Sequence, residues 1–114
     1  MRSAEPAFDE LIHAPVRLRV CGLLRPVDAL SFAVLRDSLG LTAPTLSKHL
    51  RALSDAGYVA MDKHPSAARD DDRRVGCVRL TPPGRAAFDG HVTALRQITQ
   101  FHPAGSDSKT LAGD

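Results

Sequence analysis

Aromatic residues are scarce in this chain of 114 residues, and it has no long apolar run. Aromatic side chains make up 4% of the sequence, so leucine, valine and alanine must build any hydrophobic core. No apolar run reaches the length of a membrane span, and the N-terminus lacks the apolar stretch of a signal peptide. With 43% hydrophobic residues the chain is not wholly disordered. We therefore expect one folded domain in the cytoplasm.

Cysteine and histidine show no pattern of a metal or redox centre. Cys21 and Cys77 are far apart without CxxC spacing, which favours two buried small side chains over a redox-sensing pair. The five histidines lack compact ligand spacing, so we predict no metal and no cofactor, although His13 and His102 could meet across a dimer interface. No nucleophile–base pair, phosphate loop or carboxylate dyad is recognisable, so we do not expect an enzyme.

Residues 31–58 predict two short helices joined by a tight turn. Ser31 is a good N-cap for the first helix. Gly40 can adopt the left-handed conformation that ends this helix. Thr42 caps the second helix, and Pro44 stands in its first turn, where a missing N–H costs nothing. This arrangement is typical of a helix-turn-helix motif.

The second helix, expected at about residues 42–56, has two different faces. Leu46, Leu50 and Leu53 follow the i, i+4, i+7 spacing of one inward stripe. The outer face is small, polar and basic, with no acidic residue before Asp55. The absence of carboxylates suits this face to the major groove of DNA, because a carboxylate there would be repelled by the phosphates. A plain amphipathic helix in a helical bundle is the alternative. The candidate DNA contacts on this helix are Thr42, Thr45, Ser47, Lys48, Arg51 and, at the margin, His49.

Two short β-prone segments, residues 58–64 and 75–80, flank a polar loop and predict a hairpin with a long tip. Arg73 and Arg74 are candidates for contact with the minor groove or its phosphates. The aspartates at 70–72 would be repelled by the same surface. A solvated tip with internal Arg–Asp pairs is the alternative.

A helix-turn-helix followed by a hairpin is a winged helix, a mainly α fold with a small β-hairpin (α+β). Three segments resemble the winged-helix regulators of the MarR type and, more loosely, the ArsR type. They read IHAPVRLRVCGLL from Ile12, LSKHLRALSDAGYV from Leu46 and RLTPPGRAAF from Arg79. The resemblance implies a regulator of transcription that binds double-stranded DNA. Arsenical-type metal sensors carry paired cysteines in the first helix of the motif, which here reads SFAVLRDSL and has none.

The remaining helices complete the domain. Residues 8–13 predict a short helix that ends before Pro15, and residues 16–24 predict a helix buried on more than one side. The last helix, about 82–101, begins after the cap Thr81. Its apolar face is wider than one thin domain needs, and consists of Ala87, Phe88, Val92, Leu95, Ile98 and Phe101.

We expect a flexible leader at 1–7, a winged-helix domain at 8–102 and a disordered tail at 103–114. The resemblance implies that the last helices of two subunits pack together, whereas folding of this helix onto its own domain is the alternative. The expected function is a homodimeric repressor with an unknown small-molecule effector. An effector or redox sensor with a pocket beside the dimer helices, and a protein–protein interaction module, are the alternatives. A net charge of +2 permits DNA binding without demanding it.

Overall fold

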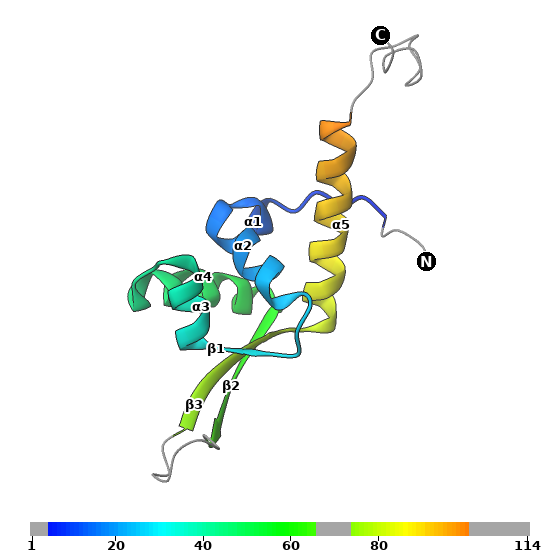
Figure 1. Ribbon diagram of the computed structural model, residues 1–114. Helices are drawn as coiled ribbons and strands as arrows, with labels where there is room; N and C mark the ends of the chain where they lie inside the picture. Colours follow the sequence, from blue (N-terminus) through cyan, green and yellow to red (C-terminus); the bar gives the residue numbers. More distant parts are fainter. Residues whose placement is uncertain (1–4, 66–73, 101–114) are drawn as a thin grey trace, which may run out of the picture.

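The computed structural model describes residues 5–65 and 74–100. Helices α1 to α4 form a cluster, from which the β2–β3 hairpin and α5 extend in opposite directions (Figure 1). This arrangement confirms the predicted α+β winged helix. The elements are α1 (Glu10–His13), α2 (Pro15–Leu24), β1 (Leu30–Ser31), α3 (Phe32–Leu39), α4 (Ala43–Asp55), β2 (Val59–Pro65), β3 (Arg74–Leu80) and α5 (Pro82–Thr99).

The helix-turn-helix forms at the predicted residues because its local signals agree. The Ser31 hydroxyl accepts a hydrogen bond from an amide in the first turn of α3 at 3.1 Å. Gly40 ends α3 with φ of +66°, a conformation that glycine adopts at little cost. The Thr42 hydroxyl accepts from the amide of Thr45 at 3.3 Å and begins α4. Gly57 has φ of +82° and follows the end of α4.

The core lies between the helical cluster and the base of the hairpin. Leu46, Leu50 and Leu53 are all buried, which confirms the predicted inward stripe of α4. Cys21 is also fully buried, and burial raises the pKa of its thiol to about 12. Because the thiolate is the reactive form, this cysteine behaves as a small core side chain. Cys77 is half-buried in β3, and both cysteines are free.

Three features differ from the sequence prediction. Strand β1 was not predicted; it pairs antiparallel with β3 and makes a three-stranded sheet of order β1–β3–β2. Helix α1 begins at Glu10 instead of residue 8, because the Asp9 carboxylate caps it by accepting from the Ile12 amide at 3.1 Å. Helix α5 ends at Thr99, whereas Phe101 lies outside the described residues.

The first half of α5 is fastened to its own domain. The Arg25 guanidinium donates to the Asp89 carboxylate at 2.8 and 2.9 Å. Arg85 donates to the carbonyls of Arg25 and Val27 at 2.9 and 3.1 Å. At Gly84, α5 lies so close to the backbone of Tyr58 that an added Cβ would lie 2.0 Å from the Tyr58 carbonyl oxygen. These contacts fix the direction in which α5 leaves the domain.

A buried histidine joins α5 to the N-terminal part of the chain. His91 is fully buried, and its Nδ1 accepts from the Asp9 amide at 3.0 Å. A ring nitrogen that accepts a hydrogen bond carries no proton, so in the neutral ring of His91 the proton is on Nε2. Nε2 then donates to His13 Nδ1, 3.2 Å away. The Phe8 ring packs against both imidazoles, and the Ala7 amide donates to the Gly90 carbonyl at 2.9 Å.

The buried histidine predicts that acid destabilises the fold. Burial and, less strongly, His13 hold the pKa of His91 below its usual 6.5, against the opposing effect of Asp9. The neutral ring therefore stabilises the protein fully above pH 6.5, and this contribution is lost as the pH falls through the lower folded pKa. His91→Asn keeps an acceptor for the Asp9 amide without the titration. Urea unfolding should show a smaller loss of stability between pH 7.5 and 5 in the variant than in the wild type. Equal losses would contradict this role.

Candidate nucleic-acid interface

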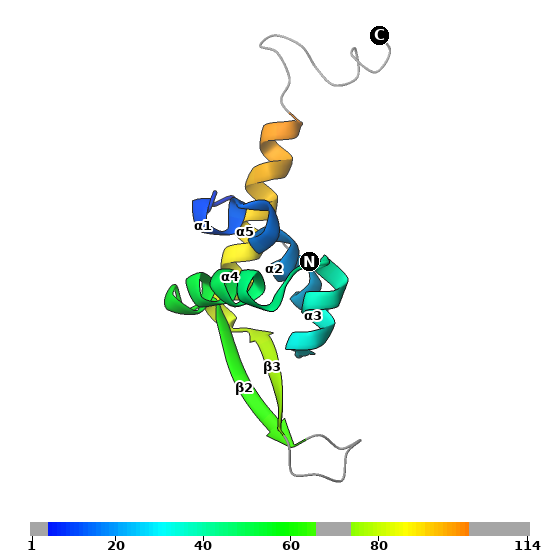
Figure 2. The same ribbon diagram turned by 90° about the vertical axis from the view of Figure 1, so that its left-hand side faces the viewer.

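Helix α4 presents an exposed face without acidic side chains. It lies across the helical cluster at the base of the hairpin, and α5 points away from both (Figure 2). The basic residues Lys48 and Arg51 are exposed, and the first acidic residue of the helix is Asp55, at its last position. The predicted contacts that are exposed on or next to this helix are Thr42, Thr45, Ser47, Lys48 and Arg51.

The two threonines are at the N-terminal end of α4 and bond to each other. The Thr42 hydroxyl donates to the Thr45 hydroxyl at 2.9 Å while it caps the helix. Both side chains remain exposed. The free amides of a first helical turn and the helix dipole favour negative charge at this end. Thr42 therefore has a structural role as a cap in addition to its predicted contact with DNA.

His49 is at the margin of the face, half-buried against α2. Its Nδ1 lies 3.1 Å from a terminal nitrogen of Arg17. Burial, followed by the charges of Arg17 and Lys48, holds the pKa of His49 below its usual value. Arg17 was not predicted as part of this surface. It is 32 residues away in the sequence, and no spacing rule connects a residue of α2 with one of α4.

The hairpin extends from the same side as α4. Its register runs from the pair Val59 and Leu80 to the pair Pro65 and Arg74, which places the Arg74 backbone at the far end. Along its length Arg79 donates to the Asp62 carboxylate at 3.0 Å. This ion pair is exposed and contributes about 0–1 kcal/mol. Arg73 and the aspartates at 70–72 lie outside the described residues, as does the side chain of Arg74.

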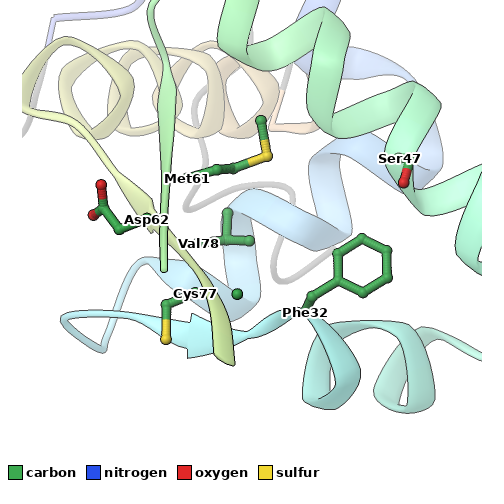
Figure 3. Close-up of a pocket in the computed structure, with 7 residues that line it drawn as sticks. Phe32, Ser47, Met61, Asp62, Cys77 and Val78 are labelled. Carbon is green, nitrogen blue, oxygen red and sulfur yellow. The ribbon is translucent and has the colours of Figure 1, made fainter. Parts of the chain in front are cut away.

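A mostly apolar hollow of about 420 Å³ lies between the helix-turn-helix and the hairpin. Figure 3 shows Phe32 and Ser47 on the helical side and Met61, Val78 and Cys77 on the strands. Met61 is 48% exposed, so the hollow is open to solvent. The sequence left open a ligand pocket beside the dimer helices, whereas this hollow is at the other end of the domain.

Residues 5–65 and 74–100 lack the features of a membrane span and of a metal site. None of their helices is long and apolar enough to cross a membrane. They also hold no group of three side chains suited to a metal ion. His13 bonds to His91, and its predicted partner His102 is not among these residues.

Comparison with known proteins agrees with the geometry. A family model described as a winged helix DNA-binding domain matches residues 16–99. A transcriptional regulator homologue from Pyrococcus horikoshii is 25% identical, with 80% of this chain and 86% of that chain covered and a TM-score of 0.71. A MarR-family transcriptional regulator from Silicibacter pomeroyi is also 25% identical, with 90% and 68% covered and a TM-score of 0.56.

The S. aureus protein MepR, solved in complex with DNA, shares the fold at 18% identity. Its TM-score is 0.65, with 91% of this chain and 76% of that chain covered. The family match spans α2 to α5, and therefore includes the helix-turn-helix and the hairpin. The resemblance to MarR-type regulators is thereby confirmed, and the chain belongs to the winged helix DNA-binding domain family of transcriptional regulators.

Proposed function

We propose that this protein is a homodimeric repressor that binds a specific sequence of double-stranded DNA, with α4 in the major groove. The observation that carries the proposal is the exposed face of α4, where Lys48 and Arg51 stand without a carboxylate before Asp55. The likeness to MepR, which was solved with DNA bound, supports DNA as the partner. A cytoplasmic location is part of the proposal, because a bacterial regulator meets its operator DNA in the cytoplasm.

The residue types on α4 suggest how the contacts divide. Lys48 and Arg51 neutralise phosphates or donate to guanine in the major groove. The hydroxyls of Thr45 and Ser47 are short donors and acceptors, suited to the backbone or to base edges at close range. The exposed Thr42, already bonded as the helix cap, contacts a phosphate at the N-terminal end.

The second half of α5 supports the dimer. Ala87 and Phe88 pack against the core of their own domain, so part of the predicted apolar face is already used. Beyond them Val92 and Leu95 are only half-buried, and Ile98 is 59% exposed. We propose that this second half packs against the same helix of another subunit. Two α4 helices would then read half-sites about one helical turn, roughly 34–36 Å, apart.

Selection of bound sequences from random double-stranded DNA tests the function directly. The expected result is enrichment of an inverted repeat, with tighter binding to it than to unrelated DNA. Enrichment of nothing, together with equally weak binding to all DNA, would favour the protein–protein interaction module instead. A reporter gene placed behind the selected repeat distinguishes repression from activation.

The tip of the wing gives a separate prediction. If Arg73 and Arg74 approach DNA while residues 70–72 oppose it, changing the three aspartates to asparagine should raise the affinity for all DNA. The gain should be larger at low salt, because exposed charges are screened beyond about 10 Å at 0.1 M ionic strength. Replacing Arg73 and Arg74 with alanine should have the reverse effect. Binding titrations at two salt concentrations measure both, and unchanged affinities would place the tip away from the DNA.

A further inference from the structure

We propose that Arg17 is a positioning residue of the DNA-binding face, which holds His49 as a neutral donor with its Nε2–H directed to solvent. The assignment of the His49 tautomer depends only on contacts within the domain. Its consequence for binding rests on the proposed function, because a directed Nε2–H matters only if DNA lies against α4.

Arg17 is anchored by a second hydrogen bond, besides its contact with the histidine. Its Nε donates to the Leu11 carbonyl at 2.6 Å. That carbonyl is in the short helix α1, where the last carbonyls have no partner within the helix. One end of the guanidinium is thereby held by α1, while NH1 reaches His49 Nδ1 at 3.1 Å. Helix α1 thus fixes the arginine that in turn fixes a side chain of α4.

The chemistry of the pair decides the tautomer of His49. A guanidinium has five N–H donors, no acceptor, and does not deprotonate in proteins. The nitrogen that faces it must therefore accept, so His49 Nδ1 carries no proton. In a neutral imidazole the proton is then on Nε2. Arg17 selects one of the two neutral tautomers, and does so at the edge of the proposed contact surface.

The other ring nitrogen is available to a ligand. No buried side-chain nitrogen or oxygen in the described part of the chain lacks a hydrogen-bond partner. His49 Nε2 has no partner among those residues, so it is not buried and reaches solvent. It can donate to a phosphate oxygen, or to an acceptor on a base, from the margin of α4.

The same contact keeps the ring uncharged. Protonation of His49 would place a proton on Nδ1, directly against the Arg17 donor, and would break the hydrogen bond. Two charged groups face the ring, Arg17 from α2 and Lys48 from α4 itself. Both are positive and would repel a protonated His49. Helix α1 contributes the Leu11 carbonyl, which bonds to Arg17 and carries no net charge. His49 therefore acts as a neutral donor where an isolated surface histidine would become a cation in mild acid.

Long-range ¹H–¹⁵N NMR of the whole protein tests the tautomer without DNA. We expect His49 Nδ1 to be unprotonated and Nε2 protonated at pH 7.5, with titration below the usual histidine range. In Arg17→Met both tautomers should appear and the pKa of His49 should rise. Arg17→Lys, which restores a cationic donor, should return part of the wild-type behaviour. An Nδ1-protonated His49 in the wild type, or unchanged titration in Arg17→Met, would overturn the proposal.

A second measurement tests the consequence for binding. Fluorescence anisotropy with the selected DNA should give a wild-type affinity that changes little between pH 7.5 and 5.5. In Arg17→Met, acid should tighten binding as His49 becomes a cation, by up to about tenfold per pH unit, the limit for one linked proton. Adding His49→Gln to Arg17→Met should remove this gain. The gain appearing already in the wild type, or persisting in the double variant, would overturn the assignment. If no DNA binds but the tautomer is as expected, the proposed function fails and the role of Arg17 in holding His49 stands.

Discussion

Replacing Lys48 and Arg51 with alanine should abolish most of the sequence-specific binding of this protein. Each side chain is expected to contribute about 1–3 kcal/mol if it reads a base edge. Both are exposed on α4, away from the leucine stripe, so the substitutions leave the core intact. Gel-shift titration of the double variant on the selected DNA measures the loss. Wild-type affinity in this variant would mean that α4 does not face DNA.

A matched control and the salt dependence separate the possible causes. Arg96→Ala removes an exposed positive charge from α5, which extends away from α4 (Figure 1). Because Arg96 is in the half of α5 that is proposed to dimerise, sedimentation first compares its assembly with that of the wild type. With the assembly unchanged, this variant should change affinity little. If Lys48 and Arg51 contact only phosphates, the double variant should weaken binding to all sequences alike and reduce the dependence on salt. If they read bases, the loss should be larger on the selected DNA than on unrelated DNA. An equal loss in Arg96→Ala would indicate a general effect of net charge.

Ile98→Glu should convert the proposed dimer into a monomer. Because Ile98 is 59% exposed within one subunit, a glutamate there costs the isolated fold little. In the dimer the carboxylate would be buried without a partner, which costs several kcal/mol per ion. Sedimentation of the intact protein at micromolar concentration should show the loss of the dimer. Affinity for the inverted repeat should then fall to that of a single half-site.

Gln97→Glu is the control for this substitution. It introduces the same charge at the neighbouring exposed position, about 100° around the helix and away from the Leu95 and Ile98 face. The control should remain dimeric and keep its affinity. A wild-type chain that sediments as a monomer and still binds the repeat tightly would contradict the dimer, as would a dimer that persists in Ile98→Glu.

The helix-turn-helix was predictable because each of its signals is local. Ser31, Gly40 and Thr42 act within three or four residues of the helix ends that they define. The leucine stripe follows from the period of a helix alone. The order of elements then limited the fold to a winged helix. That fold in turn predicted which face of α4 remains exposed.

The missed features depend on residues that are distant in the sequence. Strand β1 has two residues, too few for any alternation, and forms only because β3 offers it a free edge. His91 gave no signal as a lone histidine on an apolar helix face. It is held by Asp9 and His13, which are 82 and 78 residues away.

Local periodicity and capping are encoded in neighbouring residues, so the sequence by itself determined the helices of the motif, the hairpin and the basic face of α4. The tertiary structure decided which side chains of separate elements meet. In the folded chain His49 contacts Arg17. The first half of the apolar face of α5 packs against the core, whereas the second half extends beyond the domain. The physical reason is that side-chain hydrogen bonds and burial depend on positions in space, which no spacing along the chain specifies until the helices have packed.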